Sequence, residues 1–152
     1  MTVISFASPV GRLYLEETDG ALVSLDWSAR PETGRSPLLG EAVRPLDAYF
    51  AGKLRQFDLP MHPEGTDFRR RLWRAMTDIP YGETRTYGDL ARVAGGSPRA
   101  VGGACGANPL PILIPYHRVL AAGGRFGGYS GAGGLATKRV LLDIESCNSR
   151  LL

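Results

Sequence analysis

Cysteine is scarce in this sequence: Cys105 and Cys147 are the only two among 152 residues. Two cysteines are too few for the disulfide scaffold of a small secreted domain. The chain also lacks an apolar run of about 18 residues, which a membrane-spanning helix needs. It has no basic start followed by an apolar segment, the pattern of a secretory signal. These absences exclude a membrane-spanning protein and lead us to expect a cytoplasmic one.

Acidic residues are sparse in the second part of the chain. Residues 1–60 carry 6 basic and 8 acidic side chains, whereas residues 61–152 carry 12 basic and 7 acidic ones, and eleven of those 12 are arginines. Arginine binds phosphate in a fork and stacks on bases better than lysine does. The second part therefore favours a polyanionic partner, although an ordinary solvated surface explains the charges equally well.

The first third of the chain predicts a small sheet. The stretch TVISFASPVGRLYLEETDGALVSLDW contains three short runs of alternating apolar residues, separated by the turn sequences PVG and DG. Residues 38–53 then have the apolar spacing of a helix, which Pro45 should kink or begin. The apolar stripe of that helix comprises Leu39, Val43, Leu46 and Phe50.

The second part of the chain predicts a mainly helical domain. Thr66, Thr86 and Ser97 each precede a short helical pattern and should cap its N-terminus. Gly95 and Gly96 separate the second and third of these helices, and two short helices joined by a tight glycine turn are typical of a helix-turn-helix. The stretch LATKRVLLDIES predicts a last amphipathic helix. The expected class is thus α/β of the α+β type, with a three-stranded sheet plus helix before a helical domain.

The second helix of the helix-turn-helix has glycines in its interior. Gly102 and Gly103 each cost about 1 kcal/mol of helix stability relative to alanine. That cost suggests that something approaches the helix closely, such as a DNA backbone or groove. Arg99 lies in the first turn of the same helix, at the end that enters a groove in DNA-binding helix-turn-helix proteins. Tight packing between two helices explains the glycines equally well from spacing alone.

The stretch IPYHRVL, residues 114–120, has the pattern of an active-site segment, with a His-Arg pair between apolar residues and behind a proline. The residue before the histidine should then be the reactive one. It is Tyr116, and a phenol with a pKa of about 10 is ionised in only about one molecule in a thousand at pH 7. A cysteine thiol, with a pKa of about 8.5, is ionised to a few per cent. Tyr116 is therefore a poor nucleophile at neutral pH.

Four segments resemble, in this order, the O6-alkylguanine-DNA alkyltransferase family: IPYGETRTYGDLA, RAVGGACGANP, ILIPYHRV, and GGYSG with LATKRVLLDIE. The resemblance covers about residues 65–146. The most specific motif of the family is Pro-Cys-His-Arg, and Tyr116 replaces its reactive cysteine. In this respect the chain is similar to the alkyltransferase-like proteins, which also lack that cysteine and bind alkylated DNA without removing the alkyl group.

The resemblance implies two domains. The first is a small ribonuclease-H-like α/β domain at residues 1–62, and the second is a DNA-binding alkyltransferase domain with a winged-helix-like helix-turn-helix at residues 63–152. The zinc site of some family members needs cysteines and histidines in the N-terminal domain, and residues 1–60 contain neither. We therefore expect no metal and no other cofactor.

The resemblance also implies roles for individual residues. Asn108, His117 and Glu145 match the network that activates the family cysteine, whose position Tyr116 occupies. The family flips a damaged guanine out of the duplex, and Arg99 matches the residue that takes its place. The other residues implied to bind DNA are Tyr87, Ala100, Gly102, Gly103 and Arg118. Those implied to border the base pocket are Cys105, Tyr129, Ser130 and Lys138.

We therefore expect a non-enzymatic sensor in DNA repair that binds DNA carrying O6-alkylguanine. The ring of Tyr116 can stack on an extruded base, which is worth about 1–3 kcal/mol. The alternative is a single-turnover alkyltransferase that uses Tyr116 or Cys105, or an engineered variant in which tyrosine replaces cysteine. A helix-turn-helix regulator is a further alternative. The expected partners are double-stranded DNA with alkylated guanine and nucleotide excision repair proteins. The expected state is a monomer that does not bind membranes.

Overall fold

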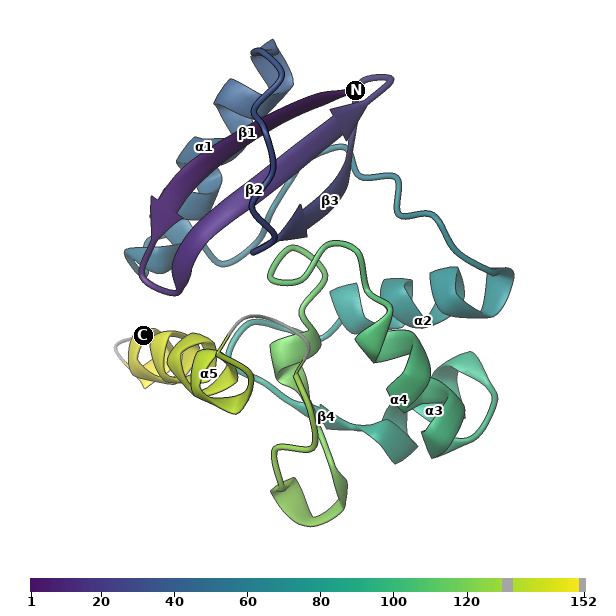
Figure 1. Ribbon diagram of the computed structural model, residues 1–152. Coiled ribbons are helices and arrows are strands. Elements are labelled where there is room, and N and C mark those ends of the chain that lie inside the picture. Colours follow the sequence, from purple (N-terminus) through teal and green to yellow (C-terminus); the bar gives the residue numbers. More distant parts are fainter. Residues whose placement is uncertain (130–132, 151–152) are drawn as a thin grey trace.

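The computed structural model describes residues 1–129 and 133–150, and a sheet lies above a group of helices in it (Figure 1). Three strands form one antiparallel sheet in the order β1-β2-β3. They are β1 (Thr2–Ser8), β2 (Gly11–Thr18) and β3 (Ala21–Asp26). Asp19 and Gly20 both have positive φ angles, 51° and 79°, as a tight two-residue hairpin requires. The three predicted strands and the turns between them are confirmed.

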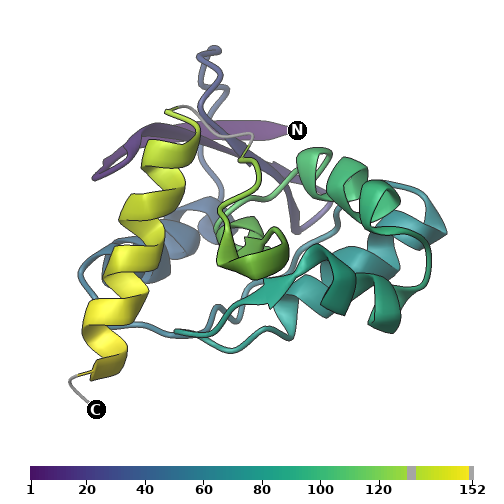
Figure 2. The same cartoon turned by 90° about the horizontal axis from the view of Figure 1, so that it is seen from below.

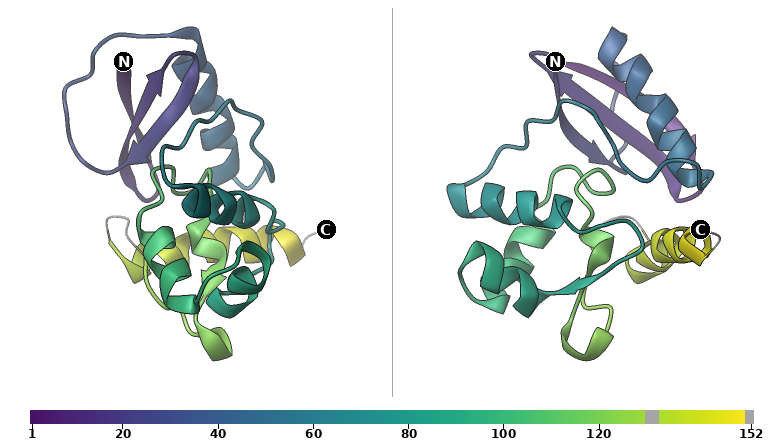
Figure 3. Two further views of the ribbon diagram at one scale, coloured as in Figure 1. Left: turned by 90° about the vertical axis from the view of Figure 1, so that its right-hand side faces the viewer. Right: turned by 180° about the vertical axis from the view of Figure 1, so that it is seen from behind.

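Helix α1 (Pro37–Phe50) lies across one face of this sheet and contacts β1 and β2 (Figure 3). Ser36 caps the helix, because its side chain accepts a hydrogen bond from the amide of Leu39. The helix continues through Pro45, which therefore does not begin it. A proline removes one helical hydrogen bond, and the carbonyl that loses its partner here belongs to the exposed Glu41.

The second half of the chain is helical. Its helices are α2 (Asp67–Thr77), α3 (Tyr87–Ala94), α4 (Pro98–Gly106) and α5 (Leu135–Arg150). Thr66, Thr86 and Ser97 cap α2, α3 and α4, each through a side chain that accepts from an amide of the first turn. Gly95 and Gly96, with φ angles of 84° and 86°, make the turn between α3 and α4. The predicted helix-turn-helix is confirmed, and so is the mixed α+β class.

A short parallel pair of strands, which the sequence analysis did not predict, lies beside the helix-turn-helix. Arg85 and Thr86 of β4 (Arg85–Thr86) pair with Val119 and Leu120 of β5 (Val119–Leu120). Strand β4 leads directly into α3, and β5 directly follows the 3-10 turn η1 (Tyr116–Arg118). Figure 2 shows this part of the chain running between α5 and the α3–α4 pair. The pair fixes the start of the helix-turn-helix beside the IPYHRVL segment.

Backbone hydrogen bonds join the sheet to the segment before α2 and to the helical half. The amide of Leu22 donates to the Pro60 carbonyl, and its carbonyl accepts from His62, both at 2.8 Å. The amide of Leu25 donates to the carbonyl of Pro109 at 2.9 Å. Buried apolar side chains of both halves form one cluster. Within the described residues, no helix combines the length and apolar composition needed to cross a membrane.

Candidate active site

The IPYHRVL segment is held in the interior by Asn108. The side chain of Asn108 accepts a hydrogen bond from the amide of Leu110 and donates one to the carbonyl of Ile114, both at 2.9 Å. Between these contacts, Ile112 has a φ angle of 75°, which is strained for a β-branched residue. Such strain persists only where the surroundings fix the backbone, and it concentrates at functional sites. Asn108 therefore shapes the loop that delivers the turn η1.

All three residues of η1 are buried, and two of them bind one carboxylate of α5. Glu145, which is 1% exposed, accepts from Nε2 of His117 at 2.6 Å and from Nε and Nη2 of Arg118 at 2.8 and 3.1 Å. The Tyr49 hydroxyl at 2.6 Å and the Gly82 amide at 3.2 Å complete the set. Burial alone would raise the pKa of Glu145, but the hydrogen bonds from His117 and Arg118 and the positive charge of Arg118 lower it to about 2. The carboxylate is therefore ionised at neutral pH.

The protonation state of His117 follows from this arrangement. An ionised carboxylate only accepts hydrogen bonds, so Nε2 of His117 carries a proton and donates it to Glu145. Burial lowers the pKa of His117 below its usual value and outweighs the opposing effect of Glu145. The ring is therefore neutral, and its Nδ1 has a free lone pair. Nδ1 is buried and has no hydrogen-bond partner among the described residues, so it is available as a proton acceptor.

Tyr116, the residue before His117, lies among aromatic rings. Its ring is tilted against that of Tyr129 with centroids 5.4 Å apart, and Nζ of Lys138 lies 5.2 Å from its centroid. Burial, followed by a hydrogen bond with the Tyr87 hydroxyl, raises the pKa of Tyr116 far above its usual value. The Tyr87 hydroxyl also accepts from the Gly128 amide at 3.3 Å. The phenol of Tyr116 is therefore held in its protonated form.

Lys138 and Cys105 lie beside Tyr116 in the interior. Nζ of Lys138 donates to the carbonyls of Val119 at 2.6 Å, Gly128 at 2.9 Å, and Phe126. Burial lowers the pKa of Lys138 to about 8. The thiol of Cys105 lies 3.8 Å from the Met76 sulfur, and burial raises its pKa to about 12, with Lys138 acting weakly in the opposite direction. The thiol is therefore protonated at neutral pH.

The outer face of α4 carries almost no side chains. A Cβ atom added at Gly102, Gly103 or Gly106 would meet no other residue within 4 Å. Tight packing between helices, the alternative explanation of these glycines, is therefore wrong. Arg99 and Ala100 are exposed on the same helix. A partner outside the protein can approach the backbone of α4 closely along this face.

One of the expected roles needs correction. Arg118, expected to bind DNA, is 7% exposed, and it donates to Glu145 and, at 2.7 Å, to the Ile79 carbonyl. Its guanidinium is therefore not available to phosphates. Lys138, expected near the polar edge of the base, uses its ammonium group to hold three backbone carbonyls. Ser130 lies outside the described residues.

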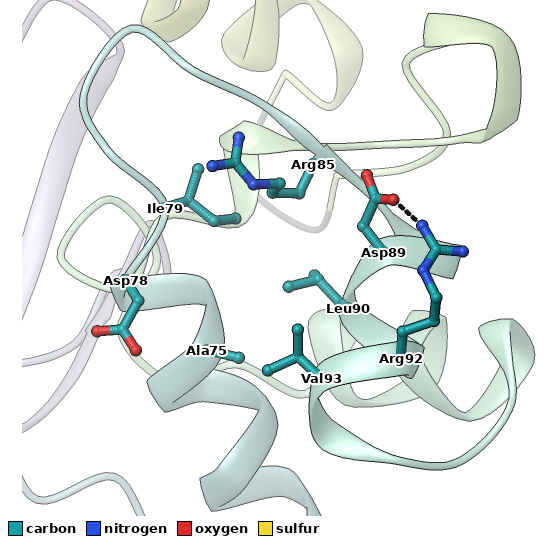
Figure 4. A pocket seen from close by; sticks show the side chains of 8 residues that line it. All are labelled: Ala75, Asp78, Ile79, Arg85, Asp89, Leu90, Arg92 and Val93. Carbon is teal, nitrogen blue, oxygen red and sulfur yellow. Dashed lines mark hydrogen bonds and ion pairs between the residues drawn. The ribbon is translucent and has the colours of Figure 1, made fainter.

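Sequence reasoning missed Tyr49, whose hydroxyl binds Glu145. A tyrosine three residues after Leu46 on a helix is an ordinary core residue by pattern, so no sequence signal distinguished it. The cavity in Figure 4, about 530 Å³, lies elsewhere, between the end of α2 and α3. Its lining includes the Asp89–Arg92 ion pair but no residue of η1. The described residues contain no group of three or more potential metal ligands.

Comparisons with known proteins cover almost the whole chain. The family model described as 6-O-methylguanine DNA methyltransferase, ribonuclease-like domain, matches residues 1–63, and the one described as the DNA binding domain of the same family matches residues 67–147. A methylated-DNA–protein-cysteine methyltransferase of Methanosarcina barkeri is 44% identical over 94% of this chain and 96% of its own. The protein of that name from Mycolicibacterium paratuberculosis is also 44% identical, over 93% and 90%.

The fold is similar to that of a solved DNA complex. The crystal structure of Mycobacterium tuberculosis OGT in complex with DNA has a TM-score of 0.88 and 40% sequence identity to this chain. The match covers 97% of this chain and 94% of that one. The similarity therefore includes the sheet, the helix-turn-helix and the turn η1.

Proposed function

Because this chain belongs to the O6-methylguanine DNA methyltransferase family, we propose that it binds DNA and takes an O6-alkylated guanine out of the duplex into a pocket bordered by Tyr116. Relatives are named for action on methylated DNA, and one is solved in complex with DNA. The observation that carries the proposal is the bare outer face of α4, next to the exposed Arg99. An O6 atom inside a base stack is unreachable unless the base is flipped out.

In this proposal, Arg99 fills the gap left by the flipped guanine, and Tyr87 and Tyr129 lie around the base. Arg99→Ala should then weaken binding to an alkylated duplex more than binding to the matching single strand. Fluorescence anisotropy with both oligonucleotides measures this difference. Equal losses on the two substrates would limit Arg99 to a phosphate contact, and a parent chain without preference for the alkylated duplex would overturn the proposal.

The fate of the alkyl group divides the proposal into two candidates. The narrower resemblance to alkyltransferase-like proteins has no support among the relatives described above. The proteins of Methanosarcina barkeri and Mycolicibacterium paratuberculosis are both named as methyltransferases, which favours alkyl transfer. Alkyl transfer needs a nucleophile such as a thiol, and Cys105 supplies a buried one. The chemistry of the site favours binding alone, because burial keeps both the Tyr116 phenol and the Cys105 thiol protonated.

Intact-mass measurement after incubation with O6-methylguanine duplex separates the two candidates. A gain of one methyl group that disappears in Cys105→Ser would establish transfer to that thiol. A gain that disappears in Tyr116→Phe would establish transfer to the phenol. Tight, alkyl-specific binding without any gain in mass would establish binding alone. In that case excision-repair proteins are the proposed partners, since the lesion then needs a second activity, and a monomer suffices to present it.

A further inference from the structure

One side chain of the sheet-containing half reaches the Glu145 network. Tyr49 lies in α1, is fully buried, and donates its hydroxyl proton to Oε2 of Glu145 at 2.6 Å. The same hydroxyl oxygen lies 3.2 Å from Nε2 of His117. These two partners follow Tyr49 in the sequence by 96 and 68 residues. Residues 1–63 thus contribute the Tyr49 hydroxyl to the contact between Glu145 and His117.

The ring of Tyr49 is surrounded by aromatic side chains, and its hydroxyl contacts Glu145 and His117. Its ring packs against those of Phe50 and Phe57, each with centroids 5.5 Å away, and Tyr81, at 6.2 Å. Burial, followed by the negative charge of Glu145, raises the pKa of Tyr49 well above its usual value. The phenol therefore stays protonated. A buried hydroxyl without a partner would cost about 1–3 kcal/mol, so its position is tied to the carboxylate.

We propose that Tyr49 is a positioning residue through which residues 1–63 regulate the hydrogen bond between Glu145 and His117, by sharing carboxylate oxygen Oε2 with the imidazole. Oε2 accepts at 2.6 Å from both the phenol and the imidazole. Each donor draws electron density from Oε2 and so weakens the hydrogen bond that Oε2 accepts from the other donor. The phenol therefore limits how strongly Glu145 can stabilise a protonated His117, and it keeps the ring neutral with a free Nδ1.

The other groups that act on His117 do not depend on Tyr49. The positive charges of Arg118 and Lys138 oppose protonation of the ring, and the negative charge of Glu145 favours it. Arg118 is fixed by its own bonds to Glu145 and to the Ile79 carbonyl, and Lys138 by three carbonyls. Removing the Tyr49 hydroxyl therefore changes one contact of Oε2 and leaves these charges in place.

Replacing the hydroxyl should make His117 more basic. In Tyr49→Phe, Oε2 is left to the imidazole and the guanidinium, so the pKa of His117 should rise. Two-bond proton–nitrogen spectra of the full-length chain, labelled with nitrogen-15, report this value and the tautomer directly. The sequence has only two histidines, so the exposed His62 is an internal reference. The titration runs from about pH 8 to about pH 4, which extends below the usual range of histidine because the pKa of His117 is lowered.

A matched control separates the hydroxyl from the ring. Phe57→Leu disturbs the same aromatic cluster but keeps the Tyr49 hydroxyl, so it should leave His117 unchanged. Tyr49→Met removes the hydroxyl with a different apolar side chain and should move His117 in the same direction as Tyr49→Phe. Unchanged titration of His117 in both Tyr49 variants, or an equal shift in Phe57→Leu, would overturn the role of Tyr49.

A role of the Tyr49–Glu145 contact in alkyl chemistry rests on the proposed function, whereas its effect on the pKa of His117 does not. The spectra need no DNA, so a failed titration would remove the role of Tyr49 and leave lesion binding untouched. Loss of preference for alkylated DNA in the parent chain would do the reverse.

Discussion

His117 and Tyr116 are neighbours in the chain, but their surroundings are opposite in character. His117 joins a network in which one ionised carboxylate collects hydrogen bonds from four residues. Tyr116 lies against the ring of Tyr129 and near an ammonium group whose protons are given to backbone carbonyls. Around His117, the charges of Glu145 and Arg118 are paired, whereas around Tyr116, burial keeps the phenol and the Cys105 thiol protonated.

The contrast separates two requirements of group transfer that normally occur together. Moving a proton needs a base of fixed tautomer, which His117 and Glu145 supply. Accepting a group needs an ionised nucleophile, and neither the phenol of Tyr116 nor the thiol of Cys105 is ionised at neutral pH. The site therefore combines a proton-accepting network with a neighbouring phenol that is protonated at neutral pH.

Glu145→Gln should have the largest effect, because it leaves the buried guanidinium of Arg118 without its counter-charge. Breaking a buried ion pair from one side costs about 3–5 kcal/mol. Tyr116→Phe, on the other side of the turn, removes one hydroxyl and should cost about 1 kcal/mol. Urea unfolding at neutral pH measures both values. Equal losses in the two variants would mean that the two sides of η1 do not differ in the way described.

Acid should weaken the same network. The pKa of Glu145 is about 2 in the folded protein, below its ordinary value of 4.5, so the folded state binds this proton less tightly than the unfolded state does. The resulting stability is fully present above the ordinary value and is lost as the pH falls through the folded value. The loss is on the order of 3 kcal/mol. Urea unfolding at neutral and acidic pH should show a steeper loss for the parent than for Glu145→Gln, and parallel losses would contradict this.

Tyr116→Cys should sharpen the contrast by placing a thiol beside the network of His117 and Glu145. Cysteine ionises about 1.5 pKa units below tyrosine, which is roughly 2 kcal/mol, before any help from His117. The smaller side chain also leaves space for an alkyl group. Intact mass should show a gain of one methyl from O6-methylguanine DNA. The double variant with His117→Gln should lose most of the rate. A Tyr116→Cys variant that stays inert would mean that the pocket has diverged beyond this one residue.

Gly103→Ala should have the smallest effect on stability and an opposite one on binding. The added Cβ meets no other residue within 4 Å, so the protein should gain about 0.5–1 kcal/mol from the better helix former. DNA affinity should fall, because the methyl group stands on the bare face of α4. Gly40→Ala is the matched control, since Gly40 is an exposed glycine of α1 with equally open space. Equal DNA affinity in both variants would contradict a close approach of DNA to α4.

Features encoded locally were predictable from the sequence. The caps at Thr66, Thr86 and Ser97 and the turn at Gly95-Gly96 depend on residues within one helical turn, and all were found where expected. The parallel pair β4–β5 was not predicted, because a strand of two residues has no periodicity and its partner lies 34 residues away. Of the two alternatives for Pro45, the structure excludes a helix that begins there, because packing of α1 on the sheet outweighs one lost hydrogen bond.

The candidate site was predictable only in part. The motif around Pro115-Tyr116-His117-Arg118 identified the turn, and the resemblance identified Glu145 as its partner. The resemblance placed Arg118 among the residues that bind DNA, whereas the side chain is buried. Its burial depends on a carboxylate 27 residues later in the chain. Tyr49 was beyond reach for the same reason, since its hydroxyl contact is decided by how two halves of the protein meet.

The pairing of strands β4 and β5 holds together the two ends of the segment between them. Residues 87–118 leave and return at neighbouring strands, which lie about 4.8 Å apart. Helix α4, with its bare outer face, and the turn that holds Tyr116 therefore lie on one segment, whose ends are joined by this strand pair. Further contacts hold the segment along its length, because Nε1 of Trp73 donates to the Ala104 carbonyl and the amide of Leu25 donates to the Pro109 carbonyl, both at 2.9 Å. Lengthening the segment at the Gly95-Gly96 turn would therefore cost little closure entropy, because that cost grows only slowly with loop length.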